Sequence, residues 1–222
     1  QTIKYSDLIF AITPHDKKIY DSLGAKNVKV LPLSALPRII KNNREIIDKD
    51  RLNVFFAGST YNVPHNKKAL EMVLKEIAPR VRRYFPGKFV INILGNKFPS
   101  EFKKYLNEDT KYLGYIEDYE AIMSDMDIAL IPYLAGGGMQ QKIFEPMVRG
   151  IPTISSCRGL AGYPFKDQEH ILLAEIADNF VSALHQLEDI NLRKKISINA
   201  IRLSHDLFSL ENMDKIIDNI YE

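Results

Sequence analysis

Hydrophobic and polar positions alternate along the chain in blocks that predict strands followed by helices. Residues 7–13 form an apolar block typical of a buried strand. Residues 14–24 follow with helical spacing, between a leading Pro14 and a closing Gly24. Residues 27–31 predict a second short strand that ends at Pro32. The stretch after it is rich in proline, asparagine and charge and has weak periodicity, so we expect a linker over residues 36–51.

From residue 52 the pattern becomes a regular succession of apolar strands and amphipathic helices. Strands that are apolar throughout are typical of a parallel sheet covered on both faces. The expected strands lie at 52–57, 88–94, 111–113, 127–131, 151–155 and 170–174. The expected helices lie at 66–84, 100–107, 118–124, 140–149, 175–188, 190–204 and 209–221. We therefore predict an α/β fold, a Rossmann-like doubly wound parallel sheet.

Glycines follow four of these predicted strands. Gly58, Gly95 and Gly114 stand directly after three of them, and the consecutive glycines 136–138 come shortly after a fourth. Glycine allows a backbone to approach a ligand closely and to adopt positive φ. The carboxyl ends of parallel strands meet at one edge of a sheet, where ligands bind. We therefore expect the four glycine-bearing loops to converge on one crevice.

The loop with three glycines is the most informative, because an amphipathic helix follows it at once. A helix start presents unpaired N–H groups and the positive end of the helix dipole, which suits a phosphate. Lys142 and Glu145 lie early on this helix, three residues apart, and so share a face. Lys142 could balance phosphate charge and Glu145 could accept hydrogen bonds from ribose hydroxyls, whereas the alternative is a surface salt bridge between them. The opposite face is expected to pack on the core through Ile143, Phe144, Met147 and Val148.

Other patterns argue against several chemistries. The spacings of the P-loop and of the dinucleotide-binding glycine fingerprint are absent, which disfavours nucleotide hydrolysis of the Ras type. The single cysteine, Cys157, excludes an internal disulfide. His65 follows the first strand of the regular region and could face the crevice, but single loop histidines are usually solvated, and we favour that interpretation. The other histidines lack the spacing of metal ligands, so we expect no metal site.

The composition is that of an ordinary globular protein. Of the 222 residues, 45% are hydrophobic and 26% are charged, and the formal net charge is +2. The basic residues form isolated pairs, which are more typical of solvated helix faces than of a nucleic-acid surface, and we expect no nucleic-acid partner. The longest apolar run, 128–135, is too short to span a bilayer. No signal peptide is evident, and we expect a cytoplasmic protein.

A series of short motifs runs in a fixed order from residue 52 to the end of the chain. The motifs are Phe55-Phe56-Ala57-Gly58-Ser59, Pro64-His65-Asn66, Ile93-Leu94-Gly95-Asn96, Leu113-Gly114-Tyr115-Ile116-Glu117-Asp118, Asp127-Ile128-Ala129-Leu130-Ile131-Pro132, Gly136-Gly137-Gly138, Lys142-Ile143-Phe144-Glu145-Pro146-Met147, Gly150-Ile151-Pro152, Gly159-Leu160-Ala161-Gly162 and Phe208-Ser209-Leu210-Glu211. In order and spacing, the series resembles the carboxy-terminal domain of GT-B-fold glycosyltransferases of the retaining group 1 (family 4) type.

In that family this domain binds a nucleotide-diphosphate sugar, and the resemblance implies roles for individual residues. Backbone amides of the glycine loop would hold the pyrophosphate and sugar, Glu145 would hold the ribose, and Gly58-Ser59 would close over the phosphates. The base pocket would be lined at Gly95-Asn96 and Tyr115-Ile116. No metal or cofactor is implied, because helix dipoles and cations stabilise the leaving diphosphate. The implied donor-binding residues are Gly58, Ser59, Gly95, Asn96, Tyr115, Ile116, Gly136, Gly137, Gly138, Met139, Gln140, Lys142 and Glu145.

Four positions depart from the family pattern, and one of them, Leu210 in place of the usual tryptophan, is expected to change only packing. Ser59 stands where many members carry an arginine, so Lys67 or Lys142 would have to supply the missing positive charge. Gly137 stands where many members carry a second glutamate. Pro146 stands where the family prefers alanine, and a proline inside a helix removes one backbone hydrogen bond. We therefore expect sugar contacts that differ in detail from those of the family.

The resemblance implies a retaining, metal-independent glycosyltransferase that moves a sugar from a nucleotide-diphosphate sugar to a glycan or lipid-linked acceptor. Residues 1–35 would be a remnant of the amino-terminal GT-B domain, 36–51 the linker, and 52–222 the nucleotide-sugar-binding domain with its carboxy-terminal helices. The catalytic residues are unknown and are expected mainly on the missing domain, so this chain alone should transfer little or no sugar. The full-length protein could associate peripherally with the inner face of the membrane.

Two other functions remain open on the sequence. A nucleotide-sugar epimerase of the same fold usually keeps a histidine and an acidic pair in its cleft, and no clear pair is present here. A nucleotide-binding or assembly domain that has lost catalysis would be consistent with Ser59 and Gly137. Product formation by the full-length protein would exclude this second alternative.

Overall fold

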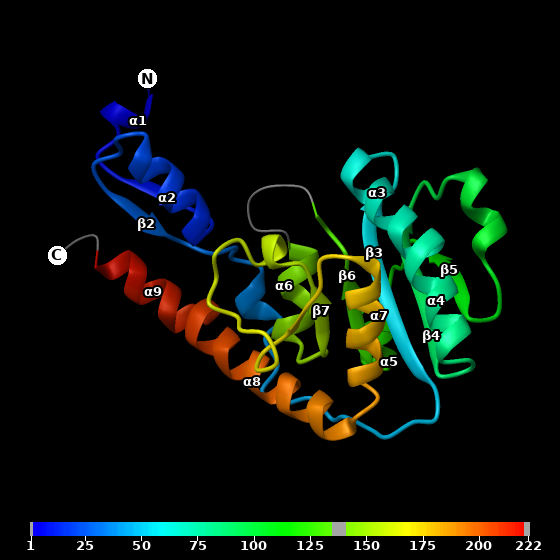
Figure 1. Ribbon diagram of the computed structural model, residues 1–222. Coiled ribbons are helices and arrows are strands. Elements are labelled where there is room, and N and C mark those ends of the chain that lie inside the picture. The colour runs from blue at the N-terminus through cyan, green and yellow to red at the C-terminus, as the bar shows by residue number, and fades with distance from the viewer. Residues whose placement is uncertain (1, 135–140, 220–222) are drawn as a thin grey trace.

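A six-stranded parallel sheet forms the centre of the molecule (Figure 1). The computed structural model describes residues 2–134 and 141–219. The strand order is β5-β4-β3-β6-β7-β8, so the chain runs outward from β3 in one direction and then returns to its other side at β6. The strands are β3 (Leu52–Thr60), β4 (Phe89–Asn96), β5 (Thr110–Gly114), β6 (Ile128–Ile131), β7 (Thr153–Ser155) and β8 (Leu172–Leu173). The predicted Rossmann-like doubly wound sheet is confirmed, and its topological switch point lies between β3 and β6.

Helices cover the sheet in two groups. The first group packs together and consists of α3 (Pro64–Met72), the π-helical turn η2 (Val73–Ile77), α4 (Ala78–Tyr84) and α7 (Ala177–Gln186). The second group pairs α6 (Gln141–Val148) with α8 (Ile190–Phe208). Right-handed connections between parallel strands place the two groups on opposite faces of the sheet. Within the described ranges, no helix combines the length and apolar character needed to cross a membrane.

The remaining helical segments after residue 30 are short. They are α5 (Tyr119–Asp125), α9 (Leu210–Asp218), and the 3₁₀ turns η1 (Leu36–Arg38), η3 (Ser100–Tyr105) and η4 (Cys157–Leu160). Residues 100–107 were expected to form an α-helix, but η3 is held by hydrogen bonds that span three residues, such as the one from the Phe102 N–H to the Pro99 carbonyl at 3.0 Å. Polar side chains cap two of these helices where the sequence predicts a start. Asp118 accepts from the Ala121 N–H at the start of α5, and Ser209 accepts from the Asn212 N–H at the start of α9.

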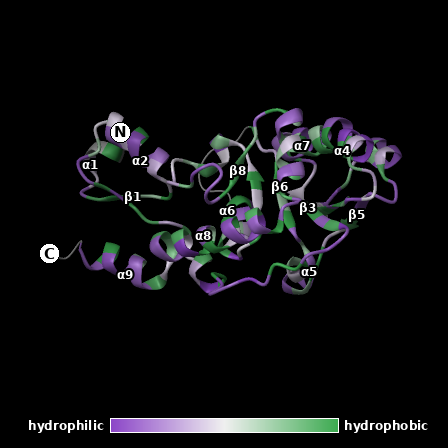
Figure 2. Cartoon of the chain, turned by 60° about the horizontal axis from the view of Figure 1, so that its bottom comes forward, coloured by the Kyte–Doolittle hydropathy of each residue, from purple (hydrophilic) through white to green (hydrophobic). Residues whose placement is uncertain are grey.

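The hydrophobic core lies between the sheet and both groups of helices. Residues Phe89 to Leu94 of β4 and all of β6 are buried, as expected for strands covered on both faces. Figure 2 shows hydrophobic residues concentrated in the central strands, while the helices around them are mostly hydrophilic on their outer sides. The predicted apolar stripe of α6 is confirmed, because the four side chains at 143, 144, 147 and 148 are fully buried.

The first 30 residues form a small separate unit. It consists of α1 (Thr2–Tyr5), β1 (Ile9–Ala11), α2 (Pro14–Ser22) and β2 (Val28–Val30), and the two strands pair in parallel. Figures 1 and 2 both place this unit at the same end of the molecule as α9. Two hydrogen bonds connect it to the segment after η4, from the Tyr163 hydroxyl to the Ile12 carbonyl at 2.7 Å and from the His15 N–H to the Ala161 carbonyl at 3.2 Å. The division of the chain at residue 35 stays a prediction.

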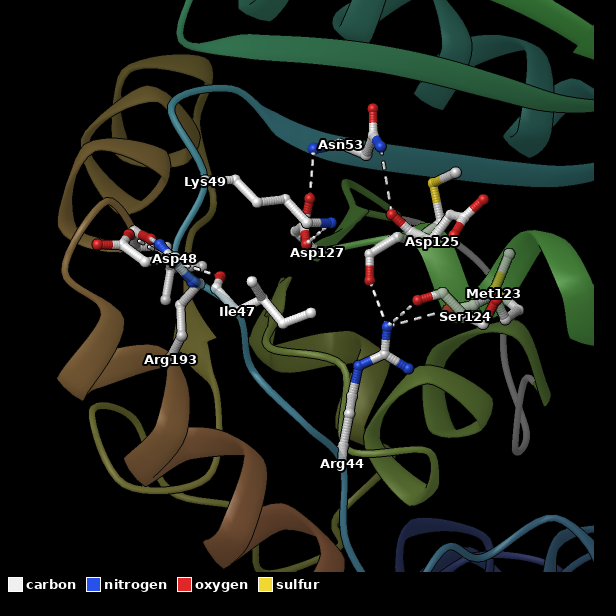
Figure 3. Close-up of polar contacts among 12 residues, drawn as sticks. Arg44, Ile47, Asp48, Lys49, Asn53, Met123, Ser124, Asp125, Asp127 and Arg193 are labelled. Atoms are coloured by element: carbon white, nitrogen blue, oxygen red, sulfur yellow. Dashed lines mark hydrogen bonds and ion pairs between the residues drawn. The ribbon is translucent and has the colours of Figure 1, made fainter.

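Residues 39–51 contain no helix or strand, yet they are bound closely to the main sheet (Figure 3). The Arg44 guanidinium donates to the carbonyls at the end of α5, including that of Met123 at 3.0 Å. The Lys49 ammonium pairs with Asp127 at 2.7 Å, and the buried Arg193 of α8 donates to the Ile47 carbonyl at 3.4 Å. Asp127 also accepts from the backbone N–H of Asn53, at the amino end of β3. The segment therefore runs along the amino-terminal edge of the sheet.

Candidate functional site

A cavity of about 710 Å³ opens at the opposite, carboxyl edge of the sheet. Its walls come from the ends of β3, β4 and β5, the first turns of α3 and α5, and the first two turns of α6. This is the edge at which doubly wound sheets bind ligands. The lining residues are Ala57, Gly58, Ser59, His65, Leu94, Gly95, Gly114, Tyr115, Ile116, Tyr119, Gln141, Lys142 and Glu145.

Most of the described residues that the sequence assigned to donor binding meet in this cavity. The structure brings together Gly58, Ser59, Gly95, Tyr115, Ile116, Lys142 and Glu145. Asn96 is exposed and does not line the cavity, although its carbonyl accepts from the Tyr61 N–H at 2.9 Å. His65 was expected to be solvated, but it is half-buried and lines the cavity, so the crevice-facing alternative is the one observed. The residues predicted in the glycine loop lie outside the described residues, namely Gly136, Gly137, Gly138, Met139 and Gln140.

Close backbone approach shapes the wall between β3 and β4. Gly95 has a φ of +134°, and a Cβ at this position would lie 1.7 Å from the carbonyl oxygen of Gly58. Only a glycine fits where two backbones are so close and φ is positive. Gly114 at the end of β5 lines the same cavity. The predicted convergence is therefore confirmed for the three glycine-bearing strand ends that the structure describes.

The end of β3 differs from the prediction. The apolar pattern indicated a strand that stops at Ala57, but β3 continues to Thr60. Its pairing with β4 shifts register after Ala57 and resumes at Thr60 opposite Asn96, which is the signature of a β-bulge. Gly58 and Ser59 consequently belong to the irregular end of a strand rather than to a free loop, and this fixes their position at the cavity.

Tyrosine hydroxyls hold the carbonyl groups at these strand ends. All three tyrosines come from outside the strands that they bind, and burial raises the pKa of two of them, Tyr61 and Tyr133, so that they stay neutral donors. The hydrogen bonds run from Tyr61 to the Leu94 carbonyl at 2.6 Å, from Tyr112 to the Gly95 carbonyl at 2.7 Å, and from Tyr133 to the Ala57 carbonyl at 2.8 Å. These bonds satisfy carbonyls at the mouth of the cavity and keep its backbone wall rigid.

Lys142 is the cation that α6 brings to the cavity. Its Nζ donates to the Asn66 side-chain oxygen at 2.6 Å and lies 3.6 Å from the centroid of the Tyr133 ring. Burial lowers the pKa of Lys142 to about 8. No carboxylate among the described residues forms a salt bridge with this ammonium, so it is available to an anionic ligand.

Lys67 is placed differently. Its ammonium pairs with Glu101 at 2.8 Å, its side chain is 46% exposed, and it does not line the cavity. Of the two lysines that could replace the arginine missing at Ser59, the structure therefore places Lys142, not Lys67, at the cavity. The sequence did not determine which of the two lysines supplies the positive charge, because this depends on the direction that the first turn of α3 faces.

Glu145 forms its ion pair with an arginine that sequence reasoning missed. The Arg149 Nη2 atom lies 3.1 Å from Glu145 Oε1, and Lys142 is not its partner, so the alternative of a Lys142–Glu145 surface salt bridge is wrong. Burial raises the pKa of Glu145, while Arg149 opposes that shift. The spacing of four residues between Glu145 and Arg149 was the signal available in the sequence.

Tyr119 lines the cavity and is another residue that sequence reasoning missed. It is the first residue of α5, directly after its capping residue Asp118, and burial beside the charge of Glu145 raises the pKa of its hydroxyl. The helix start after β5 lies at the same edge of the sheet as the other lining segments, and this position is what could have identified Tyr119. Among the described residues, no group of three or more histidine, cysteine, aspartate or glutamate side chains could hold a metal ion.

Comparison with known proteins gives the same fold at low sequence identity. A mutant of S. aureus TarM, solved with fondaparinux, alpha-GlcNAc-glycerol and UDP, superposes with a TM-score of 0.79 at 13% identity, over 100% of this chain and 45% of TarM. Anabaena HepE, solved with UDP and glucose, gives 0.75 at 17% identity, over 97% of this chain and 63% of HepE. The C-terminal domain of a group 1 family glycosyl transferase from Francisella tularensis gives 0.60 at 19% identity, over 78% of this chain and 98% of that domain. Curated protein sequences gave no significant match.

The family assignment comes from the sequence. The family model described as glycosyl transferases group 1 matches residues 51–189, which is more than half of the 222 residues. The matched range contains every residue that lines the cavity, from Ala57 to Glu145. The structural neighbours add the fold, the Rossmann-like carboxy-terminal domain of the GT-B architecture. The chain belongs to the group 1 glycosyl transferases.

Proposed function

We propose that this chain is the donor-binding half of a glycosyltransferase that uses a nucleotide-diphosphate sugar. The observation that carries the proposal is the cavity, in which one cation and one carboxylate from α6 face the backbone ends of three parallel strands. A lysine ammonium suits the diphosphate, a carboxylate suits vicinal ribose hydroxyls, and exposed backbone groups suit a base edge. TarM and HepE, which share the fold, were both solved with UDP.

Each part of the donor would have its own wall of the cavity. Lys142 would neutralise the diphosphate, together with the N-terminus of the helix that follows the glycine loop. Glu145 would accept hydrogen bonds from the ribose. The base would lie against Gly95, Tyr115 and Ile116 at the ends of β4 and β5. We infer that the developing charge on the leaving diphosphate is stabilised by these groups without a metal ion, and that the transfer retains the configuration of the sugar.

The acceptor and the groups that complete catalysis would lie outside these 222 residues. This chain spans 45% of TarM and 63% of HepE. We infer that residues 1–35 belong to the amino-terminal half of the enzyme and that residues 36–51 connect it to the donor-binding domain, 52–222. The acceptor would be a glycan or a lipid-linked glycan. Cytoplasmic location and peripheral association of the full-length protein with a membrane stay predictions.

Calorimetric titration of the chain with UDP, GDP and ADP tests the donor site and identifies its base. We expect saturable binding of one nucleotide that Glu145→Ala weakens by about tenfold, because a hydrogen bond to a charged group is lost. Glu76→Ala, which changes an exposed glutamate of η2 remote from the cavity, serves as the matched control and should leave the affinity unchanged. Failure of both this chain and the full-length protein to bind any of the three nucleotides would refute the proposal.

A sugar-transfer assay tests whether catalysis requires parts of the enzyme that lie outside this chain. The full-length protein should transfer sugar to its acceptor, whereas this chain alone should bind the nucleotide but transfer little or none. A robust transfer rate from the 222-residue chain would show that the catalytic groups lie within it and would overturn that part of the proposal.

A further inference from the structure

Arg149 is a buried arginine to which the proposed donor contacts assign no role. It directly follows α6, and its side chain is only 4% exposed. Its two terminal nitrogens contact different carboxylates, with Nη2 3.1 Å from Glu145 Oε1 and Nη1 2.6 Å from Glu120 Oε1. Its buried Nε has no hydrogen-bond partner in the described part of the chain. Burial of a guanidinium has a large desolvation cost, so the buried position of Arg149 must be offset by favourable electrostatic contacts.

The two carboxylates differ in their surroundings. The Glu120 side chain is 58% exposed and also lies 3.5 Å from the ammonium of Lys41. The Glu145 side chain is 14% exposed and lines the cavity. Ion pairs on an exposed surface contribute little, because water screens them, whereas a buried carboxylate without a partner would be strongly destabilised. The ion pair of Arg149 with Glu145 is therefore expected to contribute more than its ion pair with Glu120.

The contact has two consequences for Glu145. Arg149 occupies the Oε1 atom, while the Oε2 atom accepts no hydrogen bond from the described residues. One oxygen is thus fixed and the other is left for a ligand. In addition, burial raises the pKa of Glu145 and the negative Glu120 adds to that effect, whereas Arg149 lowers this pKa and so favours the charged carboxylate.

We propose that Arg149 is a positioning residue that holds Glu145 ionised and oriented, so that Oε2 receives the ribose hydroxyls of the donor nucleotide. The ligand in this statement rests on the proposed function, whereas the effect of Arg149 on Glu145 does not. Other ionisable or charged groups surround the pair and must be separated from it in any test. They are Tyr119 and Glu120 on α5, Lys142 and His65 at the cavity, and Lys41 and Arg44 behind Arg149.

A ratio of two affinities isolates the ribose contact. The affinity of the chain for the nucleoside diphosphate that it binds, among UDP, GDP and ADP, is divided by its affinity for the 2′,3′-dideoxy form of the same nucleotide. Groups that act on the phosphates or base affect both ligands equally and cancel. The wild-type chain is expected to prefer the ribose form by about tenfold at every pH from 5.5 to 8.

Substitution of Arg149 should change this ratio and its pH dependence. In Arg149→Met the preference should fall towards one at low pH and recover as the pH rises, because the uncompensated carboxyl is protonated over part of the range. Arg149→Lys retains a cation but not the fork of two donors, so its affinity ratio should lie between those of the wild-type chain and Arg149→Met. A methionine variant that keeps the wild-type ratio at every pH would overturn the proposal. If it does not fold, a lysine variant with the wild-type ratio at every pH would do the same.

A spectroscopic titration decides the proposal even if no nucleotide binds. The side-chain carboxyl carbon of Glu145, labelled with carbon-13 and assigned through Glu145→Gln, should titrate with a higher midpoint in Arg149→Met or Arg149→Lys than in the wild-type chain. An unchanged midpoint in the variants would overturn the proposal, whereas absence of nucleotide binding by the wild-type chain would count only against the proposed function.

Arg80→Met provides the matched control. Arg80 is an arginine of α4 that forms an ion pair with Asp178 at 3.0 Å, and it lies outside the cavity. Its substitution should change neither the affinity ratio nor the midpoint of Glu145. An equal effect of both arginine substitutions would mean that the change reports net charge alone, and it would contradict the specific role of Arg149.

Discussion

The affinity for nucleotide should depend on the protonation of Lys142. Lys142 lines the cavity, and its ammonium lies over the Tyr133 ring at 3.6 Å and donates to Asn66 at 2.6 Å. Burial holds the pKa of Lys142 at about 8, well below the ordinary value for a lysine. Removal of the proton therefore falls within a pH range in which the protein can be studied, and it removes the charge that would neutralise the diphosphate.

The size of the effect follows from this pKa. A group that titrates at about 8 is roughly nine-tenths protonated at pH 7 and about one-tenth protonated at pH 9. If only the charged lysine binds the diphosphate, affinity should fall about tenfold between these two values, with a slope that approaches one decade per pH unit. The phosphate groups of the ligand complete their own ionisation near pH 6 to 7, so their charge changes little over this interval.

Calorimetry from pH 7 to 9.5 on three variants separates this effect from general pH effects. Lys142→Arg keeps a cation that does not titrate in this range, so its affinity should be nearly independent of pH. Lys142→Met should bind weakly at every pH. Lys67→Met, which removes the exposed lysine paired with Glu101, should show the same pH dependence as the wild-type chain.

Two results would refute the reasoning. The first is a wild-type affinity that stays constant from pH 7 to 9.5, since Lys142 would then either titrate elsewhere or not contact the diphosphate. The second is a wild-type slope that persists in Lys142→Met, because another group would then be responsible.

Three further predictions concern the stability of the fold. Gly95→Ala should cost at least about 3 kcal/mol in the free energy of unfolding, because its Cβ would meet a backbone oxygen at 1.7 Å. Gly87→Ala, at a φ of +74° with open space around it, should cost only about 1 kcal/mol, and equal urea midpoints for the two would refute the argument. Tyr61→Phe should cost about 1–3 kcal/mol, because it leaves a strand-end carbonyl unsatisfied, whereas Tyr84→Phe at an exposed position should cost almost nothing; a similar loss in both would count against it. Arg193→Met should lower stability by about 2–4 kcal/mol, since its Nη1 donates to two carbonyls at 2.6 and 3.0 Å in a buried position, and an unchanged melting temperature would contradict this.

The sequence by itself determined the succession of elements and the edge of the sheet at which a ligand would bind. Continuous apolar runs such as 128–131 identify strands that are buried on both faces, because only such strands can be apolar throughout. The spacing of the apolar residues on α6 determined which face packs on the core, and therefore that Lys142 and Glu145 lie away from it. These conclusions depend on local periodicity and on the topology of parallel sheets, and both are properties of sequence.

Only the tertiary structure decided which side chains meet. The pairing of Glu145 with Arg149 rather than with Lys142 depends on a cation that must be buried against α5, a helix that is distant in sequence. The choice of Lys142 over Lys67 depends on the positions of Asn66 and Tyr133, which contact the Lys142 ammonium. The spacing of four residues offers Arg149 as a partner for Glu145. The contacts of Arg149 with Glu120 and of Lys142 with Asn66 and Tyr133 join segments that the fold brings together, and no local pattern encodes them.

The extension of β3 beyond Ala57 is a backbone feature that the local sequence pattern likewise did not predict. Its apolar run ends at Ala57, yet the strand continues to Thr60, because Gly58 lies against Gly95 on the neighbouring strand and a bulge restores the pairing. Periodicity reports which residues are buried, whereas the end of a strand is determined by the partner that continues to accept its hydrogen bonds. The sequence therefore predicted the edge of the cavity and its glycines, and the packing of β3 on β4 determined the shape of its wall.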